Sequence, residues 1–319
     1  MAVIALDLGG TKLAGAVLGR NGKVVVRSLA PLAGRSGTDV GCLIIDEIGR
    51  LAAAAAARRA TVSAVGICVP GLVHGEGRVW APNIPGWQKY PLGEQIRRYC
   101  RRIGLGAIPV AVENDRACHI LGESWLGAAR GCRDAVFLAV GTGIGAGLKV
   151  NGTVISGSSG TAGAIGWMAL DRPYQEEYRR IGCFEYHASG GGIARVARTR
   201  RDARRSITTA EVFESFERGE KPGKEVICNA VECWGMALAN VVSLLNPEMV
   251  IFGGGVFGPA AKLLAEIRRE AEKWAQPLAM ERVRLCISRL GADAGLLGAG
   301  YVATTKGMRG RGKRLQACD

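Results

Sequence analysis

The sequence predicts an α/β protein made of two similar halves, and three observations support this prediction. Each half begins with a strand, a glycine-rich turn, a second strand and an Asn-Gly turn, first over residues 3–24 and again over 134–155. Apolar, strand-like runs then alternate with helical segments in both halves, which is typical of sheets covered by helices. We therefore expect two similar sheets with a cleft between them, and ligands at the carboxyl ends of the strands, where the glycine turns lie.

The first half is expected to supply five strands and two helices. Asn21-Gly22 between apolar runs is a strong hairpin signal and separates the second strand from the third. The long segment that follows is rich in strong helix formers with helical periodicity. The expected strands are 3–9, 12–19, 24–30, 62–70 and 107–115, and the expected helices are 42–60 and 93–103.

The second half repeats this opening and then alternates helices with strands. Asn151-Gly152 is the second hairpin signal, and Asn246-Pro247 ends a long apolar helix. After the strand–turn–strand at 134–155, the expected elements are helices 223–246, 259–275 and 294–304 and strands 248–255 and 284–290. We place a first domain at 1–115 together with about 293–319, and a second domain at 116–292.

Composition is typical of a soluble globular protein. Of 319 residues, 48% are hydrophobic and 22% are charged, and no uncharged apolar run is long enough to cross a membrane. Asp7 interrupts the apolar N-terminal run, which has no basic residues before it, so we do not expect a signal peptide. Ten scattered cysteines without a Cys-x-x-Cys pair favour free thiols. We expect a cytoplasmic protein without membrane contact.

The net charge of +14 raises the question of nucleic-acid binding. Six arginines fall within 195–205, and five basic residues fall within 306–319. Neither segment has the interleaved aromatic side chains on which bases stack, so we favour a solvated helix face and an exposed tail over a nucleic-acid site. A basic surface also attracts anionic substrates such as ATP.

The first glycine turn has the residue types needed to hold phosphate. Gly9 and Gly10 let backbone N–H groups approach an anion, Thr11 adds a hydroxyl, and Lys12 adds a positive charge. Asp7, at the end of the preceding strand, could hold Mg²⁺ through water. The alternative is a tight hairpin turn without a ligand.

Two further glycine turns also follow apolar strands. The turn after 134–140 repeats the chemistry of the first, and two such turns facing across a cleft could hold the β- and γ-phosphates of one nucleotide. It comprises Gly141, Thr142, Gly143 and Gly145. In the third turn, Gly254 and Gly255 could pass close to an adenosine, because glycine lets the backbone approach a flat ligand. Entry into a helix is the alternative role for this third turn.

Glu113-Asn114-Asp115 ends the strand between the two halves. Phosphoryl transfer to an alcohol needs a carboxylate that accepts the hydroxyl proton and groups that position the acceptor. Asp115 suits the first role and Asn114 the second. A helix N-cap is the commoner use of Asn and Asp at such a junction, and it is the alternative here.

In order and spacing, these motifs resemble the ROK family, which contains sugar kinases and related transcriptional repressors with the actin-like, ribonuclease-H-like ATPase fold. The likeness covers nearly the whole chain and includes DLGGTK, APNIPGW, ENDRACHILGE, AVGTGIGAGL, GCFEYHASG and NPEMVIFGGGV. The resemblance implies ATP, Mg²⁺, a homodimer, and transfer of the γ-phosphoryl group to a sugar hydroxyl with Asp115 as general base. It also implies that Asn114 and Glu185 bond sugar hydroxyls, and that Asn83 lies on a loop near the sugar.

The segment after the second phosphate turn departs from the family's pattern. Family kinases usually carry AGEIGH here, in which the glutamate and histidine contact the sugar and the histidine joins three cysteines of CxCGxxGC around a zinc ion. This chain has Ala164 at the position of the glutamate and Trp167 at the position of the histidine. Glu176 and Tyr178 stand where the first two cysteines would be, so that Cys183 is the only zinc ligand of the family pattern that remains. One thiol cannot hold a structural zinc, and we expect no zinc site.

These replacements lead to two expectations. We favour an aromatic core formed by Trp167 and Tyr178 in place of zinc, and keep stacking of Trp167 on the substrate as the alternative. Losing two polar contacts worth roughly 1.5–3 kcal/mol each would weaken a substrate that needs both by about two to four powers of ten. A sugar with fewer hydroxyls, or with an apolar substituent at that end, would fit better. We expect His119 to be structural and favour the same role for His187.

The sequence therefore predicts an ATP- and Mg²⁺-dependent kinase of a sugar or sugar-like molecule. A catalytically silent sensor of sugar or nucleotide on the same fold is the alternative, and another ATPase of this fold with a non-sugar substrate is a third possibility. A sensor has no chemical need for a base at Asp115, which favours the kinase.

Overall fold

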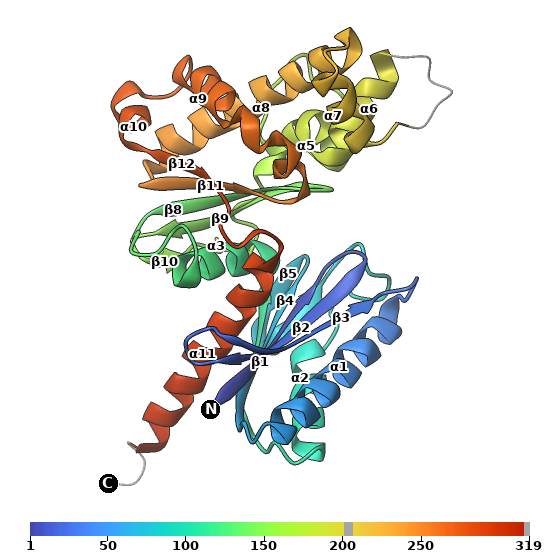
Figure 1. Ribbon diagram of the computed structural model, residues 1–319, viewed down its shortest axis with the longest axis vertical. Coiled ribbons are helices and arrows are strands. Elements are labelled where there is room, and N and C mark those ends of the chain that lie inside the picture. Colours follow the sequence, from blue (N-terminus) through green and yellow to red (C-terminus); the bar gives the residue numbers. More distant parts are fainter. Residues whose placement is uncertain (201–206, 316–319) are drawn as a thin grey trace. The chain divides into compact units, whose positions relative to one another are not determined.

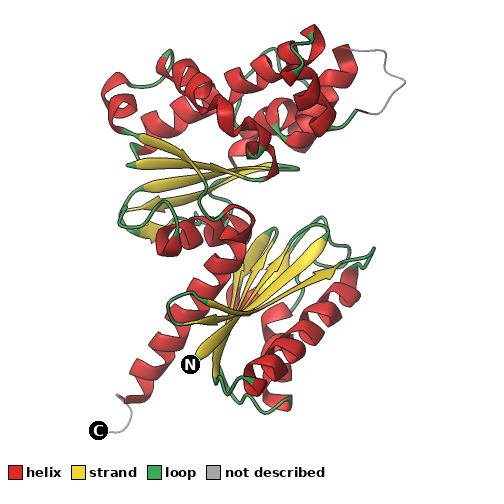
Figure 2. Ribbon diagram, in the orientation of Figure 1, coloured by secondary structure: helices red, strands yellow, loops and turns green. Residues whose placement is uncertain are grey.

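The computed structural model describes residues 1–200 and 207–315, and the chain divides into two compact units. Unit 1 comprises Met1–Arg130, Gly157–Thr161 and Ala292–Asp319, and unit 2 comprises Gly131–Ser156 and Ala162–Gly291. Each unit contains one five-stranded sheet with helices packed on it (Figures 1 and 2).

The first unit extends past the domain boundary expected at residue 115. Residues 116–130 belong to unit 1 because helix α3 (Asp115–Leu126) packs closely on helix α11 (Ala294–Leu315). Glycines make this approach possible, since a Cβ at Gly122 would collide with the backbone of α11 and a Cβ at Gly298 with that of α3.

The sheet of unit 1 has the strand order β3-β2-β1-β4-β7, in which β1, β2 and β3 are antiparallel and β4 and β7 run parallel to β1. Its strands are β1 (Ala2–Leu8), β2 (Lys12–Gly19), β3 (Val24–Pro31), β4 (Val62–Val69) and β7 (Val110–Asn114). In the register, Asp7 pairs with Cys68, and Cys68 pairs with Glu113. Parallel pairing therefore brings the polar ends of β1 and β7 to one edge of the sheet.

Helices cover both faces of this sheet (Figure 1). Helices α1 (Gly37–Ala57) and α2 (Leu92–Arg102) pack with the inward side chains of β1 and β2 into one core. Helix α11 lies on the other face, where glycines admit its backbone. A short hairpin, β5 (Leu72–His74) and β6 (Arg78–Trp80), precedes α2.

The sheet of unit 2 repeats this pattern with the order β10-β9-β8-β11-β12. Strands β8, β9 and β10 are antiparallel, and β11 and β12 run parallel to β8. The strands are β8 (Ala135–Val140), β9 (Ile144–Val150), β10 (Thr153–Val154), β11 (Met249–Gly253) and β12 (Arg284–Ile287). At the turn between β9 and β10, Asn151 and Gly152 have φ of 50° and 78°, as a two-residue type I′ hairpin requires. The internal repeat expected from the sequence is present.

Seven helices are described in unit 2, and the longest forms the centre of its core. They are α4 (Tyr178–Ile181), α5 (Cys183–Ala188), α6 (Gly190–Arg200), α7 (Thr209–Glu217), α8 (Lys221–Leu245), α9 (Leu264–Glu272) and α10 (Pro277–Arg282). By length and composition α8 could cross a membrane, but 61% of its most apolar window is buried inside the protein. It ends at Asn246, whose left-handed conformation caps the helix before a proline.

Candidate active site

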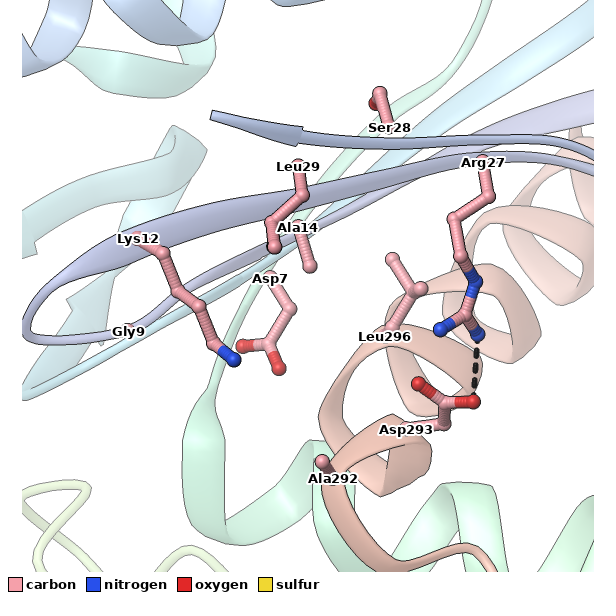
Figure 3. A pocket seen from close by; sticks show the side chains of 10 residues that line it. All are labelled: Asp7, Gly9, Lys12, Ala14, Arg27, Ser28, Leu29, Ala292, Asp293 and Leu296. Carbon is pink, nitrogen blue, oxygen red and sulfur yellow. Dashed lines mark hydrogen bonds and ion pairs between the residues drawn. The ribbon is translucent and has the colours of Figure 1, made fainter. Parts of the chain in front are cut away.

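A pocket of about 180 Å³ lies in unit 1 beside the end of β1 (Figure 3). Three parts of the chain line it: the first glycine turn with its flanking strands, strand β3, and the start of α11. The lining residues are Asp7, Gly9, Lys12, Ala14, Arg27, Ser28, Leu29, Ala292, Asp293 and Leu296. Figure 3 shows the carboxylate of Asp7 and the ammonium of Lys12 among the groups that line this pocket, together with the Arg27–Asp293 ion pair (2.5 Å). The pocket thus offers both signs of charge.

The carboxyl group of Asp7 is enclosed by its own unit. A Cβ at Gly295 of α11 would lie 2.5 Å from Asp7 Oδ2, so glycine at that position leaves room for the carboxylate. Burial raises the pKa of Asp7, a nearby imidazole and a thiol hydrogen bond oppose that shift, and Asp115 and Asp293 add to it. An enclosed carboxylate among other carboxylates fits a divalent cation, whose charge would favour the ionised form.

Two groups close to Asp7 were not expected there. His119 was predicted to be structural, yet it lies near enough to Asp7 to favour the ionised carboxylate. Cys68 hydrogen-bonds Asp7 and Cys118, and both thiols are fully buried. The hydrogen bond with Cys118 and burial raise the pKa of Cys68 well above its ordinary value. Cys118 and His119 lie one helical turn after Asp115, which is the only signal that the sequence offered for this grouping.

The first glycine turn is a tight hairpin that also leaves space for a ligand. The Gly9 N–H donates to Lys12 O at 3.0 Å, which closes the turn between β1 and β2. Gly10 and Thr11 are exposed, and a Cβ at Gly10 would meet nothing within 4 Å. The hairpin interpretation and the phosphate interpretation of this turn are therefore compatible.

The second glycine turn is shorter than the sequence motif. It consists of residues 141–143, because Gly145 lies within β9 and pairs with Ala139 of β8. The Gly141 N–H donates to Gly143 O at 2.9 Å, and Thr142 is exposed. A Cβ at Gly141 would also meet nothing within 4 Å. The turn again combines closure by one hydrogen bond with open space.

Packing accounts for part of the third glycine turn. A Cβ at Gly254, whose φ is +89°, would collide with the backbone of Val140, so this glycine is needed where the turn crosses the end of β8. Gly255 opens a 3₁₀ turn, as the alternative interpretation expected, yet a Cβ there would meet nothing within 4 Å. Of the two, Gly255 has the space that a ligand needs.

Asn114 is the N-cap of α3, as the alternative to a sugar contact predicted. Its Oδ1 accepts the Ala117 N–H at 2.9 Å, and its Nδ2 donates to Glu113 Oε1 at 3.0 Å. Asp115 follows as the first residue of α3, half-buried, with Oδ1 accepting the Arg116 N–H at 2.9 Å. The cap fixes the start of the helix and so fixes the backbone that carries the Asp115 carboxylate.

Arg116, which the sequence did not single out, holds a separate loop of unit 1. Its guanidinium donates to the carbonyl oxygens of Gly160 and Thr161, each at 3.2 Å.

Asn83 is exposed on the loop between β6 and α2, which is closed by a hydrogen bond from the Ala81 N–H to Trp87 O at 2.8 Å.

In unit 2, Glu185 of α5 lies against the second glycine turn. Its Oε2 accepts the Ile144 N–H at 2.7 Å, and a Cβ at Gly143 or Gly166 would come within 3.0 Å of the same oxygen. Burial raises the pKa of Glu185, while the hydrogen bond from Ile144 and the charge of Arg195 oppose that shift. The sequence assigned Glu185 to the sugar and gave no sign of its contact with this turn.

The aromatic core expected from Trp167 and Tyr178 is wrong. Trp167 ends a 3₁₀ turn and is 53% exposed, whereas Tyr178 is buried among Tyr174, Tyr186 and His187. Gly166 packs against Glu185, whereas Trp167, the next residue along the turn, is exposed. His187 belongs to this tyrosine group, which confirms the structural role favoured for it.

One arginine of the basic cluster has a defined contact. The Arg195 guanidinium donates to Tyr186 O at 3.0 Å and stacks on the Tyr186 ring at 4.6 Å. Residues 201–205 of the cluster and 316–319 of the basic tail lie outside the described residues. Within 1–200 and 207–315, no group of three or more His, Cys, Asp or Glu side chains is arranged to hold a metal ion.

Comparison with known proteins adds four similarities. The sequence profile of the ROK family matches residues 3–306. The chain is 28% identical to a glucokinase of Halalkalibacterium halodurans over 94% of both chains, and 34% identical to the bifunctional enzyme NanE/NanK of Brucella suis over 95% of this chain and 53% of that relative. The ROK family glucokinase from Streptomyces griseus, solved in complex with glucose and AMPPNP, is 27% identical with a TM-score of 0.74 over 96% of this chain and 100% of the other.

Proposed function

Because the chain belongs to the ROK family and has its two-domain, actin-like ATPase fold, we infer that it is an ATP-dependent sugar kinase. The observation that carries this inference is the grouping in unit 1 of Asp7, Asp115 and a glycine turn with open space. The glucose and the ATP analogue bound by the similar glucokinase support a sugar and ATP as the two substrates here. A sensor would need neither carboxylate for chemistry.

We assign the chemistry to residues in defined roles. Asp115 accepts the proton of the sugar hydroxyl while that oxygen bonds to the γ-phosphorus, the bond from phosphorus to the bridging oxygen breaks, and ADP leaves. Thr11, Lys12 and Thr142 bind phosphate oxygens, and backbone N–H groups of the two turns assist them. Asp7 would hold Mg²⁺, which neutralises charge on the phosphates. Residues 254–255 lie against the adenosine.

The sugar contacts that we propose come from Asn83, Asn114 and Glu185. Asn114 keeps its cap hydrogen bond through Oδ1 and offers a second amide hydrogen on Nδ2. Glu185 binds Ile144 through Oε2, and we assign Oε1 to a sugar hydroxyl. Trp167 provides an exposed ring where the family has a histidine, so it contributes stacking and apolar contact in place of a hydrogen bond.

We predict that the substrate carries an apolar substituent, such as the acetyl group of an N-acetylhexosamine. ADP release with Mg-ATP across hexoses, N-acetylhexosamines, deoxysugars and polyols should show turnover, with a higher kcat/KM for the substituted sugar than for its parent hexose. Trp167→Ala should reduce that preference by about two- to tenfold, the value of an aromatic contact. Trp167→Phe, which keeps a ring, should retain most of it. An unchanged preference in Trp167→Ala would remove this residue from the sugar site.

We also propose a homodimer in the cytoplasm. Three large apolar side chains, Leu244, Trp274 and Leu278, are exposed at neighbouring ends of helices in unit 2, where the Gln276 N–H donates to Ser243 Oγ at 3.0 Å. Exposed apolar patches mark interaction surfaces. Light scattering should give twice the mass of one chain, and Leu244→Asp should shift the protein toward monomer. A wild-type monomer would contradict the proposal.

A further inference from the structure

Three polar side chains of unit 2 form a compact hydrogen-bonded cluster next to helix α5. Tyr178 Oη donates to Asp171 Oδ2 at 3.1 Å and lies 2.6 Å from His187 Nε2, and that nitrogen lies 3.2 Å from Asp171 Oδ2. Each member is therefore within hydrogen-bond distance of both others. Tyr178 is at the centre and is only 7% exposed, so the loss of its hydroxyl would leave the other two groups without their shared partner.

Packing around the cluster keeps it in place. The ring of Tyr178 contacts Tyr174 and Tyr186 edge-on, with centroid distances of 6.3 and 5.3 Å. Arg195 stacks on the ring of Tyr186 and donates to the Tyr186 carbonyl oxygen. The hydrogen bonds and the ring contacts act on the same few residues, and such networks restrain side chains more than a single bond does.

Helix α5 depends on contacts of this kind because it is only six residues long. So short a helix is not stable by itself in water. Cys183 Sγ, at its start, accepts the Leu170 N–H at 3.4 Å, and Trp234 Nε1 donates to the Ala188 carbonyl at its end at 3.0 Å. His187 connects the body of the helix to Tyr178. Helix α5 is thus held at both ends, and His187 adds a side-chain contact close to its C-terminal end.

Glu185 lies two residues before His187 on this helix, and its Oε2 accepts the Ile144 N–H at 2.7 Å. We propose that Asp171, Tyr178 and His187 act together as a positioning device, which holds α5 so that the Glu185 carboxylate meets the second glycine turn and the sugar in one orientation. The sugar contact in this proposal rests on the function proposed above, whereas the contact with Ile144 does not.

Tyr178→Phe tests the proposal because it removes only the hydroxyl. We expect the KM for the sugar to rise about five- to tenfold, as the loss of a buried hydrogen bond implies, while the KM for ATP changes less than about twofold. The matched control is Tyr174→Phe, which removes a hydroxyl from a neighbouring, exposed tyrosine that bonds Glu176 at 3.1 Å. The control should leave both KM values unchanged.

A double-mutant cycle distinguishes positioning from a general structural role. If Tyr178 acts through Glu185, Tyr178→Phe should change the sugar KM by less than about twofold in a Glu185→Gln background. Full additivity of the two changes would overturn the proposal. His187→Phe, which removes the nitrogen that faces Tyr178, should reproduce the effect of Tyr178→Phe and serves if that variant does not fold.

Hydrogen exchange at the Ile144 amide gives a readout that needs no substrate. A loosened Glu185 carboxylate should raise the exchange rate of this amide at least about fivefold in Tyr178→Phe and leave it unchanged in Tyr174→Phe. Unchanged Ile144 exchange in folded Tyr178→Phe would overturn the positioning role. If no sugar is phosphorylated, the proposed function fails, and the exchange experiment still decides whether the cluster positions Glu185.

Discussion

Asp115→Asn is expected to lower kcat by about 10²–10⁴-fold, the contribution of a general base, and to leave ATP binding unchanged. The asparagine keeps an oxygen that can accept the Arg116 N–H, which Asp115 Oδ1 accepts at 2.9 Å, so the start of α3 should be preserved. Steady-state ADP release gives kcat, and calorimetric titration gives the ATP affinity. If Asp115→Asn unfolds at the same temperature as the wild type, the lower kcat does not come from a loss of stability.

Asp39→Asn is the matched control for this experiment. Asp39 also lies in the first turn of a helix, α1, and it is exposed. Its replacement should leave kcat unchanged. Wild-type kcat in Asp115→Asn would exclude the base role, and ATP binding without turnover of any sugar by the wild-type enzyme would favour a sensor.

Asp7→Asn is expected to lower kcat/KM for Mg-ATP by roughly two powers of ten, because a metal ion contributes several kcal/mol to phosphoryl transfer. The amide cannot supply the negative charge that a cation needs. Asp293→Asn is the control, since this carboxylate lines the same pocket but is paired with Arg27 at 2.5 Å. Its partly exposed ion pair predicts less than about a fivefold change. An equal decrease of kcat/KM in Asp7→Asn and Asp293→Asn would contradict the assignment of the metal to Asp7.

The raised pKa of Asp7 also predicts how activity depends on pH. Metal and proton compete for one carboxylate, so the acid limb of the wild-type profile should move to lower pH as Mg²⁺ is increased, and Asp7→Asn should abolish that movement. In metal-free protein the folded state favours protonated Asp7. Protonated Asp7 therefore contributes to the free energy of unfolding at low pH, and this contribution is lost as pH rises through the raised pKa of Asp7. Mg-ATP should restore stability above that pH, which thermal unfolding would measure.

The local parts of the fold could be predicted from the sequence. The two Asn-Gly turns specify hairpins because few residues adopt positive φ, and the apolar runs between glycine turns gave the strands of both sheets. Helices α4, α5 and α7 were not predicted, and α6 was expected only in part, as the helix face at 195–205, since the stability of these short helices comes from tertiary contacts more than from sequence periodicity.

The candidate site could be predicted only where its residues follow one another in sequence. The glycine turns and Asn114-Asp115 were found in this way, and Asn114 has the capping role that local chemistry predicts. The approach of His119 to Asp7 and of Glu185 to Ile144 depends on strand register and helix packing, which no local pattern records. Trp167 was misplaced for a related reason, because burial of a side chain depends on the direction that its turn takes.

The packing of α11 in unit 1 has a consequence for biosynthesis. This helix is encoded after all of unit 2, yet its Gly295 lies against Asp7, which is encoded before unit 2. The sheet of unit 1 is therefore synthesised well before the helix that covers one of its faces. Unit 2, which is almost continuous in sequence, has all its strands available earlier. The carboxylate proposed to hold the metal is enclosed only when translation has reached α11, so a nascent chain cannot have a complete pocket beside Asp7 before that point.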